Sequence, residues 1–110
     1  MNKERLLNEF FELVQIDSET KDERAIADVL KVKMEELGFT VIEDDSAQRS
    51  GHGAGNLIAS IKGTVADADS IYFTCHMDTV VPGLGIKPEL REDDYVYSDG
   101  TTILGADDKA

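Results

Sequence analysis

The amino-acid sequence predicts an α/β fold in which two helices pack on a mixed sheet. Three features indicate this fold: apolar residues recur with helical spacing up to residue 37, β-rich runs follow from residue 39, and glycine or acidic turns separate the runs. Each predicted helix carries a single apolar stripe, so each needs a sheet to cover that stripe. At 110 residues the chain fits one small domain or a piece of a larger one.

The two helices are predicted from their apolar periodicity. Residues 3–16 carry one stripe at three- and four-residue steps, formed by Leu6, Leu7, Phe10, Phe11, Leu13, Val14 and Ile16. The second helix follows Thr20 and Glu23, whose spacing predicts a capping box in which each side chain satisfies a free backbone donor of the other residue. Gly38 stands where a left-handed residue would end this helix.

The strands are predicted from short apolar runs bounded by turns. Residues 39–42 and 56–61 predict two strands, and residues 87–91 with 95–97 predict a hairpin around an acidic turn. Residues 71–75 are apolar at consecutive positions, which is typical of a central strand covered on both faces. Residues 46–55 are small and polar and predict a mobile loop. We expect His52, within this loop, to be solvated; the alternative is that it reaches a site from outside.

The strong negative charge excludes some classes of partner. The formal net charge is −12 at pH 7 and the pI is about 4.4, so nucleic acids and anionic membrane surfaces would repel the chain.

No stretch has the pattern of a signal peptide or a membrane span, and we expect a cytoplasmic protein. The single cysteine, Cys75, cannot form an internal disulfide and is most simply a small buried hydrophobic residue.

A histidine and an aspartate follow the apolar run at residues 71–75. Side chains alternate along a strand, so His76 and Asp78 would project to the same side at its C-terminal end, the edge where open α/β sheets bind ligands. An imidazole binds zinc well through one ring nitrogen when the other nitrogen donates to a carboxylate. The alternative is structural, with His76 capping the end of the strand and Asp78 opening a turn.

The C-terminal segment supplies a further carboxylate. Gly100 and Gly105 allow tight turns that would bring Asp107 toward the edge of the sheet. One carboxylate can bridge two cations about 3.5–4 Å apart, the spacing found in two-metal hydrolases. The alternative for Asp107 and Asp108 is a helix N-cap. Lys109 is predicted to be a charge-balancing or surface residue without a catalytic role.

Residues 76–80 (His-Met-Asp-Thr-Val) and 104–110 (Leu-Gly-Ala-Asp-Asp-Lys-Ala) resemble the zinc-dependent exopeptidases of the M20 family, and within it the peptidase-T-like members. The resemblance covers the whole chain and implies a three-layer α/β/α catalytic domain with two zinc ions. It implies that His76 binds one zinc, that Asp78 is the catalytic residue that orients His76, and that Asp107 bridges both zincs and precedes a non-proline cis peptide to Asp108. The implied activity removes the N-terminal residue from tripeptides or other short peptides by means of a metal-bound hydroxide and a glutamate base.

The sequence departs from the family after the Asp-Asp-Lys motif. In the family, the base glutamate, three further metal ligands and a lid and dimerisation domain all come later in the chain than this motif. We therefore expect residues 1–110 to be the N-terminal part of an M20 catalytic domain that is inactive alone. The resemblance is compatible with a complete enzyme that forms a homodimer. Each zinc would keep at most two protein ligands, fewer than the three that a catalytic site requires. The alternatives are another M20 hydrolase (dipeptidase, carboxypeptidase or amino-acid deacylase) and a non-catalytic acidic binding module.

Overall fold

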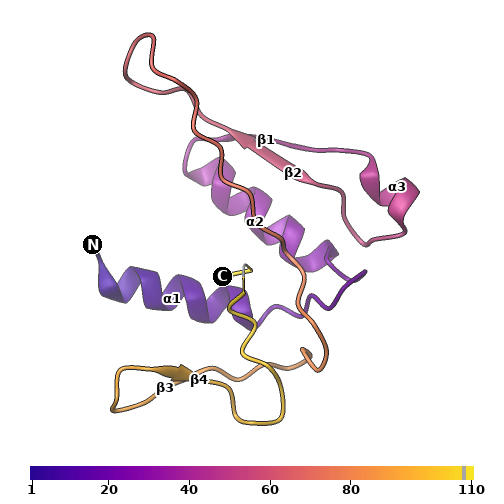
Figure 1. Ribbon diagram of the computed structural model, residues 1–110, viewed down its shortest axis with the longest axis vertical. Helices are drawn as coiled ribbons and strands as arrows, with labels where there is room; N and C mark the ends of the chain where they lie inside the picture. Colours follow the sequence, from indigo (N-terminus) through magenta and orange to yellow (C-terminus); the bar gives the residue numbers. More distant parts are fainter. Residues whose placement is uncertain (108) are drawn as a thin grey trace.

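The computed structural model describes residues 1–107 and 109–110, and within that part of the chain it contains three helices and four short strands. They are α1 (Lys3–Val14), α2 (Arg24–Glu36), β1 (Thr40–Glu43), α3 (Ser46–Ser50), β2 (Leu57–Ser60), β3 (Glu89–Leu90) and β4 (Val96–Tyr97). The β1–β2 ribbon lies over α2, and the β3–β4 hairpin lies beside α1 (Figure 1). The Cα radius of gyration is 15.6 Å, above the roughly 13 Å expected of a compact domain of this length. The helices and the strand ribbons are therefore packed together less compactly than in a typical domain of this length.

The helix ends follow from local chemistry. At the start of α1 the side chain of Asn2 accepts a hydrogen bond from the backbone N–H of Arg5 at 3.0 Å, which satisfies one of the free donors of the first turn. After α2 the chain turns at Gly38, whose φ of +92° is the left-handed conformation predicted for it. Both predicted helices and the glycine that ends the second are thus confirmed.

The predicted capping box at the start of α2 is wrong. Glu23 is the N-cap residue and makes no side-chain capping bond. Its carboxylate instead accepts the backbone N–H groups of Lys21 at 2.7 Å and Gly53 at 2.9 Å. The Thr20 hydroxyl donates to Asp78. Long-range partners compete for both side chains, and the local pattern cannot show them.

The β1–β2 ribbon provides the sheet surface on which α2 packs. The two strands are antiparallel, with Val41 opposite Ala59, and Val41 is buried against the helix layer. The buried apolar residues are Leu13, Val14, Ile26, Ala27, Val41, Ala54 and Ile86. They come from both helices, from β1 and from two loops. Among the described residues, only the β1–β2 ribbon packs on α2, and the core is correspondingly small.

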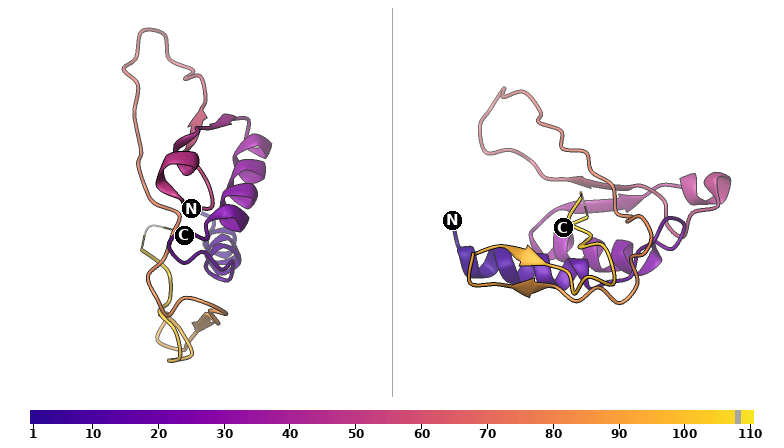
Figure 2. Two further views of the ribbon diagram at one scale, coloured as in Figure 1. Left: turned by 90° about the vertical axis from the view of Figure 1, so that its right-hand side faces the viewer. Right: turned by 60° about the horizontal axis from the view of Figure 1, so that its bottom comes forward.

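Residues 71–75 do not form the predicted central strand. Ile71, Tyr72 and Phe73 are 80, 87 and 91% exposed, and the segment passes α2 as extended chain without joining β1 and β2 (Figures 1 and 2). A strand needs neighbours for its backbone groups and layers over its faces. No described residue supplies them to this segment. Cys75 is consequently exposed rather than buried.

The segment predicted to be a mobile loop contains α3 and is held at both ends. The carboxylate of Asp44 accepts the backbone N–H of Ser46 at 3.0 Å and that of Asn56 at 2.8 Å. It therefore holds together the two ends of the segment between β1 and β2. Gly51, with φ of +76°, ends the short helix. The chain after α3 then returns to the start of α2, where His52 lies.

Candidate functional site

The His76–Asp78 segment is anchored to the connection between α1 and α2. The backbone N–H of Thr79 donates to the carbonyl of Ser18 at 2.9 Å, and the N–H of Thr20 donates to the carbonyl of Thr79 at 3.2 Å. These two bonds form a short parallel bridge around Glu19. The bridge fixes the end of the His76–Asp78 segment against the connection between α1 and α2.

Asp78 lies against the imidazole of His76, as the spacing predicts. The Nδ1 atom of His76 is 3.1 Å from Asp78 Oδ1 and 2.9 Å from the backbone oxygen of Asp78. Both acceptors face the same ring nitrogen, so the geometry favours a proton on Nδ1. In the predicted site, Nε2 would then be the nitrogen that binds the metal.

The carboxylate of Asp78 is itself held in place. Its Oδ2 accepts the Thr20 hydroxyl at 2.6 Å. That hydrogen bond is the main cause of a lowered pKa for Asp78; partial burial opposes it, and the charge of His76 adds to it. Asp78 is therefore ionised at neutral pH and serves as an acceptor on both sides.

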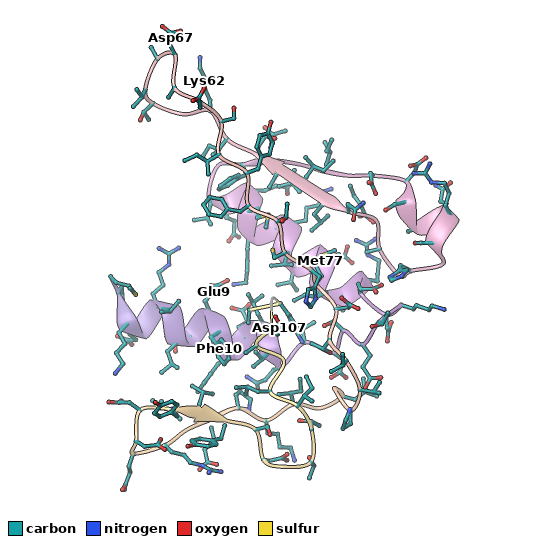
Figure 3. The ribbon with its side chains drawn as sticks, viewed as in Figure 1. Glu9, Phe10, Lys62, Asp67, Met77 and Asp107 are labelled. Carbon is teal, nitrogen blue, oxygen red and sulfur yellow. The ribbon has the colours of Figure 1, made fainter. Side chains whose placement is uncertain are left out.

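Asp107 lies between two anchored points of the C-terminal segment. Gly105 has φ of +76° and approaches Thr79 so closely that an added Cβ would lie 3.4 Å from Thr79 Cγ2 and 3.0 Å from Ile86 Cδ1. Figure 3 shows Asp107 in the middle of the view, between α1 and the segment of Met77. The Gly105 turn thus brings this segment back to the residue that follows Asp78. Asp108, including the predicted cis peptide to it, lies outside the described residues.

Of the two alternatives predicted for Lys109, charge balancing or a surface position, the surface position is wrong. Lys109 is only 4% exposed, and its Nζ donates to the backbone carbonyls of Val14 at 3.2 Å and Ile16 at 2.5 Å. Burial lowers the pKa of this ammonium, while the charge of Asp17 acts in the opposite direction. Its role is to fasten the C-terminal segment to the free carbonyls at the end of α1.

A second histidine–carboxylate pair was not predicted. The Nδ1 atom of His52 lies 2.7 Å from Oε1 of the buried Glu23. Both residues line a cavity of about 430 Å³ that His76 and Asp78 also line. In the sequence, the only signal for this pair was a histidine within a glycine-rich segment, which is a weak one.

The donor types suit zinc, but their number is small. Imidazole and carboxylate groups are common zinc ligands. Within residues 1–107 and 109–110, no group of three or more His, Cys, Asp or Glu side chains is arranged to hold a metal ion.

No helix of the described part of the chain is both long and apolar enough to cross a membrane.

The chain resembles peptidases in both structure and sequence. Two crystal structures match 99% of it: an aminopeptidase PepT from Bacillus cereus, with a TM-score of 0.95 at 60% identity, and a tripeptidase from Staphylococcus aureus, with a TM-score of 0.94 at 52% identity. The whole chain is 64% identical to an uncharacterised protein, YqjE, of Bacillus subtilis. A match to a peptidase T of Shewanella sediminis has 28% identity over 98% of the chain.

These matches define the fold of the chain. It has the mixed α/β architecture of the N-terminal portion of PepT-like peptidases. The chain spans 29% of the length of the Bacillus subtilis protein and of each matched structure, and 34% of the peptidase T. No family model matches it.

Proposed function

We propose that the chain forms the N-terminal part of the catalytic domain of an M20-type zinc exopeptidase. The complete enzyme would be of the peptidase T type and would remove the N-terminal residue from tripeptides or other short peptides in the cytoplasm. The names of the two structural relatives, an aminopeptidase and a tripeptidase, support this class of reaction.

The observation that carries the proposal is the chain of contacts from Thr20 through Asp78 to His76. A metal-ligating histidine commonly donates its second ring nitrogen to a carboxylate, which fixes the ring and raises the basicity of the ligating nitrogen. The 3.1 Å contact between His76 and Asp78 and the 2.6 Å bond from Thr20 have this form. A histidine that merely capped the end of a strand would not need a carboxylate whose second oxygen is held by a hydroxyl group, as Asp78 is held by Thr20.

His76 and Asp107 would hold the metal ions. A bound zinc pair would polarise the scissile carbonyl and lower the pKa of a water nucleophile. Asp78 would keep the His76 ring in its ligating orientation, and Gly105 would set the approach of Asp107. We propose that the base and the remaining ligands belong to a longer polypeptide, because the chain spans only 29% of the length of the two matched peptidases and a catalytic zinc needs at least three protein ligands.

The proposal can be tested in a chimaera. In it, residues 1–110 replace the matching segment of the Bacillus cereus aminopeptidase, which is 60% identical over that segment. The chimaera should hydrolyse trialanine, and His76→Ala or Asp107→Asn should reduce kcat/KM by at least about 10³-fold, together with the zinc content measured by mass spectrometry. Asp67→Asn is the matched control, because Asp67 lies at the tip of a remote loop (Figure 3).

The same assay distinguishes the alternatives. Cleavage of dipeptides, release of C-terminal residues or deacylation of amino acids would favour another M20 hydrolase. A folded chimaera in which His76→Ala and Asp67→Asn have equal zinc content and equal activity would refute the metal site. That result would leave the acidic binding module as the better interpretation.

A further inference from the structure

The second histidine–carboxylate pair, His52 and Glu23, contains a buried carboxylate. The side chain of Glu23 is only 6% exposed. Burial alone would raise the pKa of this carboxyl group, but hydrogen bonds from Lys21, His52 and Gly53 outweigh burial and lower it. Glu23 is therefore a carboxylate at neutral pH and can only accept hydrogen bonds.

This carboxylate fixes the orientation of His52. Because Glu23 only accepts, the His52 Nδ1 atom at 2.7 Å must carry the proton. In the neutral ring Nε2 is then a hydrogen-bond acceptor. No described residue bonds to Nε2 of His52, and the side chain is 37% exposed.

The backbone around His52 is held independently of the imidazole. The N–H of Gly53 donates to Glu23 Oε2 at 2.9 Å, and the N–H of Gly55 donates to Glu43 at 2.9 Å. A Cβ added at Gly53 would lie 3.0 Å from the backbone nitrogen of Glu23, so a larger residue would push the loop away from the start of α2. Replacement of His52 should therefore leave the loop in place.

The cavity beside His52 favours a cationic ligand. Its lining includes the apolar residues Leu30, Met34 and Leu57 together with the polar residues His52, His76 and Asp78. Its described lining contains no lysine or arginine, while Glu23 and Asp78 contribute two carboxylates. Such a mixed surface fits an apolar side chain attached to a positively charged amine.

We infer that His52, oriented by Glu23, binds the free α-amino group of a peptide in this cavity. Nε2 accepts a hydrogen bond from the ammonium, and the two carboxylates stabilise its charge. The inference depends on the proposed exopeptidase function for the identity of the ligand. It would explain how a peptide with a free N-terminus is distinguished from one whose N-terminus is blocked.

The test measures binding without metal or turnover. The ¹⁵N-labelled 110-residue chain in chelator is titrated with trialanine amide and with N-acetyl-trialanine amide, and the ¹⁵N signal of His52 Nε2 is followed by NMR. The free amine should move this signal, and the acetylated peptide should not. His52→Ala should weaken binding of the free amine about tenfold, the loss expected for one hydrogen bond to a charged group.

The controls separate binding from folding. Gln48→Ala, on the neighbouring α3, should bind like the parent chain. The amide signals of Gly53 and Gly55 show whether the loop is intact in His52→Ala; if it is not, the Nε2 response of the parent chain decides. Equal binding of both peptides, or an Nε2 signal that neither peptide moves, would overturn the inference. An inactive chimaera would refute the proposed function but would leave the NMR result standing.

Discussion

Thr20 is the outermost member of the contacts that orient His76. Its hydroxyl reaches Asp78 Oδ2 at 2.6 Å across a sequence separation of 58 residues. The spacing of His76 and Asp78 predicts their contact because both lie in one tripeptide. Thr20 could not be found in this way, since its local pattern indicated a capping role. The same holds for His52 and Glu23, which are brought together only when the chain after α3 returns to α2.

Removal of the Thr20 hydroxyl should weaken the metal site. In the chimaera we expect Thr20→Ala to lower kcat/KM for trialanine about tenfold, because Asp78 would lose the bond that fixes it against the His76 ring. Thr20→Ser keeps the hydroxyl and should retain most of the activity. If the alanine and serine variants were equally active, the hydroxyl would have no role in orienting His76.

The contact between Arg24 and Glu43 gives a pH dependence of stability. The guanidinium donates two hydrogen bonds to the Glu43 carboxylate, at 2.8 and 2.9 Å, and these with the N–H of Gly55 lower the pKa of Glu43 from 4.5 to about 2. The folded chain thus holds fewer protons on this group than the unfolded chain between these pH values. The stabilisation is complete above pH 4.5 and is lost as the pH falls toward 2.

Glu43→Gln should therefore destabilise the chain at neutral pH only. We expect the free energy of unfolding in urea to fall by about 1 kcal/mol at pH 7, a modest value because the pair is partly exposed to solvent. Near pH 2 the variant and the parent chain should be equally stable. Glu92→Gln, in the exposed turn between β3 and β4, is the control. The same loss at both pH values would show that packing, not charge, is responsible.

At the scale of the elements, local patterns predicted the two long helices and the strand segments, but not the short helix α3, whose small polar residues indicated a loop. The two helices, the β1–β2 ribbon and the β3–β4 hairpin each close within a short stretch of chain, so periodicity and turn residues suffice to find them. The segment 71–75 has the composition of a buried strand but is exposed, since burial requires partners that composition does not supply. Its apolar sequence fits a strand that further polypeptide would cover.

Phe73 provides a test of that cover. In the 110-residue chain the ring is 91% exposed, so Phe73→Ala should change the free energy of unfolding by less than about 0.5 kcal/mol. In the chimaera the same substitution should cost about 3–5 kcal/mol if the segment becomes a central strand. Urea denaturation of both proteins measures the difference. Equal effects in the two would mean that the segment stays exposed.

At the scale of the whole molecule, the chain is tied together at its two ends. The Lys109 ammonium donates to Val14 and Ile16, 95 and 93 residues earlier in the sequence. The Thr79 bridge joins the chain after Asp78 to Ser18 and Thr20, in the connection between α1 and α2. Both tethers meet near the end of α1, and Asp107 lies between Gly105 and Lys109 in the chain. The position of this carboxylate thus depends on how firmly the C-terminal segment is held to the first helix.

Lys109→Met should loosen this segment without removing any proposed ligand. Methionine has a similar length but no donors, so the buried carbonyl of Val14 and the partly buried carbonyl of Ile16 would lose their partner, at a cost of about 2–3 kcal/mol. In the chimaera we expect a lower melting temperature and weaker zinc binding, measured by competition with a chelator, while His76 and Asp78 remain in contact. Lys62→Met, on the loop that projects away from the helices (Figure 3), is the control. If the two methionine variants bound zinc equally well, Lys109 would stabilise the fold without positioning Asp107.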